Sequence, residues 1–508
     1  MEQLLKKKSM RLTCCALDKQ EECPISGEYT LPEYCPDVAV ILKCFAYPHI
    51  QNRQWSGDQW LLDGTAVIRV LYLDEERRCL RSLEFTQSFS CTMRGEGRAD
   101  NAAVQVELST KYLSCRAVSP RRVEVRGAIL VQAYADVVMQ KDVAVTTEND
   151  ALHTRTESLD ISVPCGACDK VLTVSESLSF HESLPPAEML LGGECRAIIR
   201  ECKVLMGKAI VKGQVFVHQL YVDSLDGGST HCLEYALPFS QIMDVDDALE
   251  GMPYYASVHV LSDTERCSVG PDGENTMLDI SVKLLLQIQV YRRDKLSVLR
   301  DAYHSRYPLS LHTEEMEIGS LLGTRWEETV LPMQLTIPSG QWQEIVDVCI
   351  QPQECVVECN DDRADINGRM IVCVVACDGD GELVYHEFVE DYGLEYPSIG
   401  NRVRARVMPT TMRYRVVEDK LEIQASVCVE MTDFYCDKKQ VISDLRLQQE
   451  MPYPQQKVTA LLYYADAGET VWNIGRVCRT SPTCIMEENA LTDECLEESK
   501  ILVVPIIN

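Results

Sequence analysis

The feature that most constrains this chain is a segment that occurs three times. In each copy a glycine opens a run of mostly apolar residues that closes on an aspartate: Gly64 to Asp74, Gly213 to Asp223 and Gly368 to Asp378. An aliphatic residue lies 22 positions before each glycine, at Leu42, Leu191 and Val346. Downstream, a glutamate is followed five residues later by an aromatic residue: Glu84 and Phe89, Glu234 and Phe239, Glu387 and Tyr392. Landmarks that recur in one order predict a triplicated domain of about 150 residues.

The residue pattern inside the repeats favours β-strands. The runs 123–133, 278–290 and 421–431 alternate in polarity and are rich in Val, Ile and Tyr, which is typical of half-buried strands. Turn-forming clusters such as Pro271-Asp272-Gly273 separate the runs. We therefore expect a mainly β protein with three tandem antiparallel domains of the β-sandwich or barrel type. Two polar segments, 146–160 and 311–324, are predicted to be linkers.

The pattern changes after about residue 455, where we expect a small βααβ module. A short strand at Leu461–Ala465 precedes Thr470, a good helix N-cap residue, and Val471, Ile474 and Cys478 then fall on one helical face. Ser481 and Pro482 predict the start of a second helix, and Ile501–Val504 a closing strand. The expected domains are therefore 1–150, 160–310, 325–453 and 458–506.

Charge and composition exclude several classes of function. The net charge is −29, so the chain repels phosphate backbones and anionic membranes, and we expect no nucleic-acid partner. Neither a signal peptide nor an apolar run of membrane-spanning length is visible, which predicts a protein that is cytosolic when made and has no transmembrane segment.

The 24 cysteines are expected to be mostly reduced core thiols, because many lie inside apolar alternating runs. Cys165 and Cys168 have the spacing of a redox motif but lie in a predicted approach between domains, followed by strand residues, rather than at a helix N-terminus. No histidine pairs with a nucleophile in a known motif. We therefore expect a non-enzyme with no catalytic residue, no metal and no cofactor.

The order of motifs resembles a known family. Leu31-Pro32-Glu33-Tyr34-Cys35-Pro36-Asp37-Val38, Leu237-Pro238-Phe239-Ser240 and Asp301-Ala302-Tyr303 are similar to motifs of the SPOCS domain of spore-forming bacteria. The C-terminal blocks 468–474, 489–491 and 502–505 resemble LysM, although Ser499 and Lys500 replace the Gly-Gln that LysM domains usually carry beside the glycan cleft. SPOCS repeats followed by LysM are similar to the SipL spore-coat morphogenetic proteins.

The resemblance implies a scaffold role in the mother cell at the forespore surface and later in the spore coat. It also implies that the LysM-like module binds the coat-basement ATPase, stage IV sporulation protein A. Two alternatives stay open: a peptidoglycan anchor, and a self-associating coat or appendage subunit cross-linked through Cys14, Cys15 and Cys23. The residues proposed for partner binding are Trp472, Arg476, Asn489 and Leu491. Trp472 is either an exposed anchor or an indole that packs on Arg476 by a cation–π contact.

Overall fold

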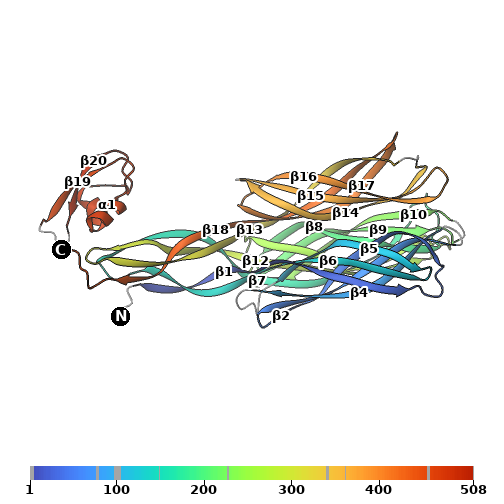
Figure 1. Cartoon of the computed structure of the whole chain (residues 1–508), viewed down its shortest axis with the longest axis horizontal. Helices are drawn as coiled ribbons and strands as arrows, with labels where there is room; N and C mark the ends of the chain where they lie inside the picture. The colour runs from blue at the N-terminus through green and yellow to red at the C-terminus, as the bar shows by residue number, and fades with distance from the viewer. Residues whose placement is uncertain are drawn as a thin grey trace.

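In a computed structural model of the chain, the described residues are 5–75, 79–95, 104–147, 149–225, 228–338, 342–360, 362–454 and 458–506. The chain forms three similar units of six strands and a small C-terminal module (Figure 1). The first unit contains β1 (Lys6–Thr30), β2 (Val38–Ser56), β3 (Gln59–Asp74), β4 (Leu80–Arg94), β5 (Val104–Ser119) and β6 (Arg122–Thr146). The second contains β7 (Leu152–Ser179), β8 (Met189–Leu205), β9 (Lys208–Val222), β10 (Thr230–Asp244), β11 (Tyr254–Ser268) and β12 (Met277–His304). The third contains β13 (Leu309–Thr336), β14 (Glu344–Asn360), β15 (Arg363–Cys377), β16 (Leu383–Pro397), β17 (Arg402–Val417) and β18 (Lys420–Leu447).

The three units share one topology. The first, fifth and sixth strands form one antiparallel sheet with the sixth strand in the middle, as in β1-β6-β5. The second, third and fourth strands form the other, as in β2-β3-β4. An apolar core fills the space between the two sheets of each unit. The predicted fold class, mainly β with several antiparallel sheets and a small helical module, is confirmed.

The repeated glycine and the repeated aromatic residue are cross-strand neighbours. Gly64 lies opposite Phe89, Gly213 opposite Phe239 and Gly368 opposite Tyr392. The ring lies over the glycine in each pair, where an added Cβ would come within 2.4, 2.4 and 2.5 Å of a ring atom or its hydroxyl. The spacing in the sequence therefore reflects the register of a β-hairpin in which an aromatic ring covers a glycine.

The three units pack against one another along the length of the molecule. One apolar cluster combines Leu71 of the first unit, Leu220 of the second and Cys373 of the third. These residues lie in the second halves of β3, β9 and β15, where nearly continuous burial replaces the alternation of the first halves. Such continuous burial indicates strands covered on both faces, one by the unit's own core and the other by neighbouring units.

Two predicted linkers are strands, which corrects the sequence analysis. The segments 146–160 and 311–324 belong largely to β7 and β13, which begin at Leu152 and Leu309. These strands and their partners β12 and β18 extend beyond the sandwiches together with β1 and β6, and form a narrower arm (Figure 1). The arm has its own core, which includes Val143, Leu296 and Val441 from the three units. The polar composition of these segments was misleading because only one face of each strand is buried.

The C-terminal module lies at the far end of this arm (Figure 1). It consists of β19 (Ala460–Ala465), α1 (Val471–Cys478), α2 (Pro482–Glu488) and β20 (Lys500–Pro505), the predicted order. Thr470 caps α1 by accepting a hydrogen bond from the backbone N–H of Asn473, and Pro482 begins α2. Neither of the helices in the described part of the chain has the length and apolar character needed to cross a membrane.

Candidate functional site

One carboxylate at the end of β12 accepts two hydrogen bonds from the C-terminal module. Asp301 Oδ2 accepts a hydrogen bond of 2.9 Å from Trp472 Nε1 and one of 2.8 Å from Arg476 Nη1. The spacing of four residues on α1 places the indole and the guanidinium on one side of the helix. Because one carboxylate accepts both donors, Asp301 fixes the orientation of α1 relative to the arm.

Tyr303 completes this contact. Its ring meets the Trp472 ring edge-on at a centroid distance of 5.0 Å, and its hydroxyl donates a hydrogen bond of 2.7 Å to the carbonyl of Thr480. Gly475 lets the helix approach, since an added Cβ would lie 2.6 Å from the Tyr303 hydroxyl oxygen. Burial, together with the nearby Asp301 carboxylate, raises the pKa of Tyr303, so the phenol stays a donor. Two residues of the Asp301-Ala302-Tyr303 motif thus hold the module.

The position of Trp472 differs from both interpretations made from the sequence. The side chain is 5% exposed, so the exposed anchor is corrected: the indole is covered by the chain's own Tyr303. Trp472 and Arg476 meet through the Asp301 carboxylate rather than by stacking on each other. No local pattern indicates this contact, because Asp301 lies 171 residues from Trp472.

Asn489 and Leu491 stabilise the module internally and take no part in the contact with β12. The Asn489 amide donates to the carbonyls of Ile485 and Val503, and its carbonyl oxygen accepts from the N–H of Val503. Leu491 packs, partly buried, against the module's small core. The four residues proposed for partner binding therefore separate into a docking pair and a structural pair.

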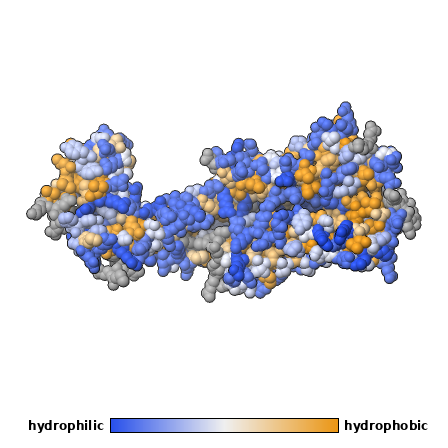
Figure 2. Space-filling model, in the orientation of Figure 1, coloured by the Kyte–Doolittle hydropathy of each residue, from blue (hydrophilic) through white to orange (hydrophobic). Residues whose placement is uncertain are grey.

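The open face of the β19–β20 sheet was not predicted as a site. Leu462, Tyr464 and Ile501 are 66%, 75% and 55% exposed, and Tyr464 lies directly opposite Ile501. Hydrophobic surface is visible at this outer end of the molecule (Figure 2). The sequence signal was present, because alternation along Leu461–Ala465 puts Leu462 and Tyr464 on one face. Exposed apolar residues that share a face are typical of an interaction surface.

Of the cysteines considered for redox chemistry or cross-linking, Cys23, Cys165 and Cys168 have described side chains, and all three are at least partly buried. Cys165 and Cys168 lie within β7, and burial raises the pKa of both thiols, which favours the unreactive protonated form. Cys23 is 3% exposed, so it is no surface thiol, whereas the side chains of Cys14 and Cys15 lie outside the described residues. Among the cysteines whose burial is described, Cys495 of the module is the exposed one.

A buried acid in β18 of the third unit gives a pH-dependent prediction. Glu430 is 5% exposed and accepts a hydrogen bond of 3.1 Å from Trp326 Nε1. Burial raises its pKa to about 7, although Arg406 opposes the shift. A carboxyl whose pKa is raised on folding binds more protons in the folded state, so stability falls as pH increases from about 4.3 to about 7.

Replacing Glu430 by Gln should remove this loss of stability at higher pH. We expect Glu430→Gln to be more stable than the wild type at pH 8, by at most about 4 kcal/mol, and to differ little at pH 4.5. Urea unfolding at the two pH values measures the difference, with Glu250→Gln at an exposed turn as the control. An equal difference at both pH values would show that Glu430 does not titrate in this window.

Comparison with known proteins gives one partial match. A family model described as SipL, SPOCS domain matches residues 186–265, which contain β8, β9, β10 and most of β11. This match supports a likeness to the SipL family and points to a protein-interaction role in sporulation. No curated protein and no solved structure matches the chain.

Proposed function

We propose that this chain is a non-enzymatic scaffold of endospore coat assembly that links the coat-basement ATPase, stage IV sporulation protein A, to the forespore surface. The observation that carries the proposal is the SPOCS match to the second unit, whose strand topology recurs in the first and third. The LysM-like blocks in the module add the likeness to the SipL arrangement. The scaffold acts in the mother cell and remains in the coat.

The arrangement suits a scaffold because body and module present separate surfaces. The three units bury their apolar residues against one another, and the arm carries the module away from them (Figure 1). The docking contact uses one side of α1 and leaves the Leu462, Tyr464 and Ile501 face open. We assign the partner contact to this β19–β20 face in place of Trp472.

A role as a peptidoglycan anchor receives less support. Ser499 and Lys500 stand where LysM domains carry Gly-Gln, and Ser499 Oγ accepts a hydrogen bond of 3.1 Å from the N–H of Ala467. Ser499 thereby ties the loop before β20 to the loop after β19, across the region where the family's glycan cleft is expected. We therefore keep peptidoglycan binding as the alternative outcome of the binding experiment with stage IV sporulation protein A.

The proposal is tested with immobilised full-length chain and purified stage IV sporulation protein A. The double variant Tyr464→Ser/Ile501→Ser should weaken binding at least about 30-fold, which corresponds to a hot-spot loss of about 2 kcal/mol. Val477→Ser is the matched control, because Val477 is an apolar α1 residue that is 67% exposed and lies off this face. Equal binding by the wild type and the double variant would contradict the assignment of the face.

A further inference from the structure

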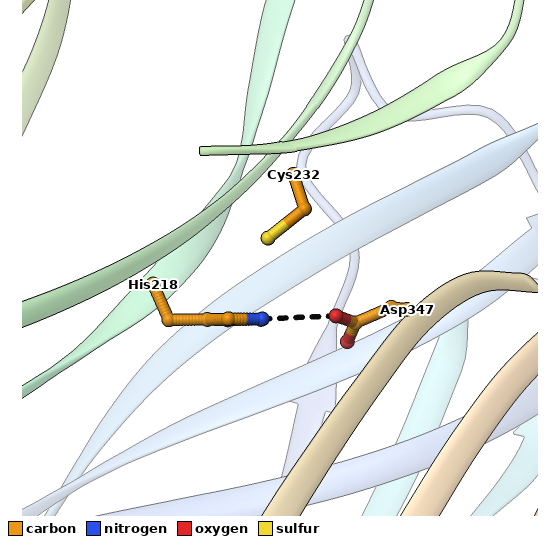
Figure 3. A group of neighbouring side chains, drawn as sticks. All are labelled: His218, Cys232 and Asp347. Carbon is orange, nitrogen blue, oxygen red and sulfur yellow. Dashed lines mark ion pairs between the residues drawn. The ribbon is translucent and has the colours of Figure 1, made fainter. Parts of the chain in front are cut away.

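Three side chains with metal-binding donor atoms meet where the second unit packs against the third. His218 comes from β9, Cys232 from β10 and Asp347 from β14, and the nitrogen, sulfur and oxygen donor atoms all lie within 4.8 Å of one another. His218 Nε2 is 2.9 Å from Asp347 Oδ1. Figure 3 shows the imidazole and the carboxylate pointing at one another and the Cys232 sulfur turned toward the gap beside them.

The donor set fits zinc. Zinc binds thiolate sulfur at about 2.3 Å and imidazole nitrogen or carboxylate oxygen at about 2.0–2.2 Å, so tetrahedral donors are about 3.4–3.6 Å apart. To reach this geometry, the 2.9 Å separation of His218 Nε2 and Asp347 Oδ1 has to widen by about half an ångström, and the Cys232 sulfur, which lies within 4.8 Å of both atoms, has to close in on the ion. The charges also balance, because one thiolate and one carboxylate neutralise Zn²⁺ and the imidazole is neutral. This balance lowers the cost of burying the site.

The site has an access route and a candidate fourth ligand. A cavity of about 250 Å³ is lined by residues that include His218, Glu234 and Cys349. Glu234 lies directly opposite His218 in the β9–β10 pair, so both side chains lie on the same face of the sheet. Three protein ligands beside an open position, filled by water or by Glu234, are an established zinc arrangement.

The corresponding positions at the other two junctions carry different chemistry. Arg69 lies five residues after its glycine, as His218 does, and its guanidinium contacts the Gly193 carbonyl and Glu84. Lys43 lies 21 residues before its glycine, as Asp347 does, and forms an ion pair with Glu387. Each repeat junction thus has a polar contact at this position, and the junction of the second and third units alone among these three combines N, S and O donors.

A second group of potential ligands is less suitable. Cys195, Asp263 and Glu265 also lie within 4.8 Å of one another. The group lies close to the positive charge of Arg69, which acts on the Glu265 carboxyl and disfavours a bound cation.

We propose that His218, Cys232 and Asp347 bind one zinc ion that ties the second unit to the third. His218 and Asp347 are 129 residues apart in the sequence, so the metal would close a long loop between two repeats. This assignment concerns the body of the protein and is independent of the module's partner. It also departs from the expectation, stated above, that the chain binds no metal.

The test uses chelator-treated full-length chain in reducing buffer, titrated with Co²⁺ as a spectroscopic probe for zinc. The wild type should show a sulfur-to-cobalt charge-transfer band and intense tetrahedral d–d bands that saturate at one equivalent and disappear when zinc is added. Cys232→Ser should lose the charge-transfer band and bind Co²⁺ at least about 100-fold more weakly, and Asp347→Asn at least about tenfold. Cys267→Ser, at a partly buried cysteine of β11 in the same unit, should behave like the wild type.

The result that overturns the proposal can be read from the wild type alone. The absence of a sulfur-to-cobalt band at one equivalent would rule out the site whether or not the variants fold. A band of full intensity in Cys232→Ser, or a band lost equally in Cys267→Ser, would likewise assign the metal to another thiol.

Discussion

Trp472→Ala is expected to free the C-terminal module from the arm. The substitution removes the ring contact with Tyr303 and the hydrogen bond to Asp301, and leaves Arg476 as the partner of that carboxylate from the module. Loss of a buried tryptophan costs about 3–5 kcal/mol, which corresponds to a shift of more than about 100-fold in the docking equilibrium. Small-angle scattering should report a broader distribution of distances, and limited proteolysis should cut between β18 and β19 sooner.

A variant on the other side of the contact separates undocking from unfolding of the module. Asp301→Ala lies in β12, outside the module, and removes the acceptor of both hydrogen bonds. It should reproduce the scattering change while the module keeps its helical signal. Asp294→Ala, at an exposed position of the same strand, is the control. Scattering curves that stay identical to the wild type in both Trp472→Ala and Asp301→Ala would contradict the docking contact.

Gly213→Val is expected to destabilise the second unit by at least about 3 kcal/mol, at the upper end of the range for overpacked cores. An added Cβ would lie 2.1 Å from the carbonyl oxygen of Ile198 and 2.4 Å from the ring of Phe239. The carbonyl belongs to the neighbouring strand β8 and takes part in the sheet, so it cannot move without cost. The midpoint of unfolding in urea should fall accordingly.

Gly319→Val provides the matched control for this prediction. Gly319 also lies in a strand, β13, but an added Cβ there would meet no heavy atom within 4 Å. Its stability should stay within about 0.5 kcal/mol of the wild type, as for substitutions away from packed features. Equal unfolding midpoints for the two variants would mean that the repeated glycine is not required by the aromatic ring that covers it.

Local patterns in the sequence predict the mainly β fold and the small helical module. The repeated glycine and the repeated aromatic residue lie opposite each other in a β-hairpin, so the hairpin register sets their spacing in the sequence. Thr470 caps α1, and the periodic residues Val471 and Ile474 are buried. Such signals depend on residues close in the chain, so they can be recognised without coordinates. The alternation that places Leu462 and Tyr464 on one exposed face is also a local pattern.

The errors all concern contacts between distant segments. The arm strands β7 and β13 are too polar to be recognised alone, because their apolar face is completed by the other two units. Trp472 meets Asp301, and His218 meets Asp347, across separations that no local pattern encodes. Sequence motifs indicated which residues belong to the module but not which of them it uses for docking.

The docking contact also bears on the proposed scaffold role. It places Trp472, the most conspicuous interface-type residue of the module, inside the chain, and turns the β19–β20 face outward. Further contacts support the same placement: the Arg479 guanidinium lies 3.5 Å from the centroid of the Tyr453 ring, and Arg155 pairs with Glu494 at 3.8 Å. The docked module would present this face to the proposed partner in one orientation, which would reduce the entropy lost on binding.

The proposed function requires the full chain to bind the coat ATPase through protein contacts. Size-exclusion chromatography with light scattering of the purified chain mixed with stage IV sporulation protein A, repeated with excess soluble peptidoglycan fragments, measures this binding. We expect the two proteins to co-elute as a complex of defined mass that the fragments leave intact. Separate elution of the two proteins, together with binding of the chain to peptidoglycan, would overturn the proposed function and make the chain a wall anchor.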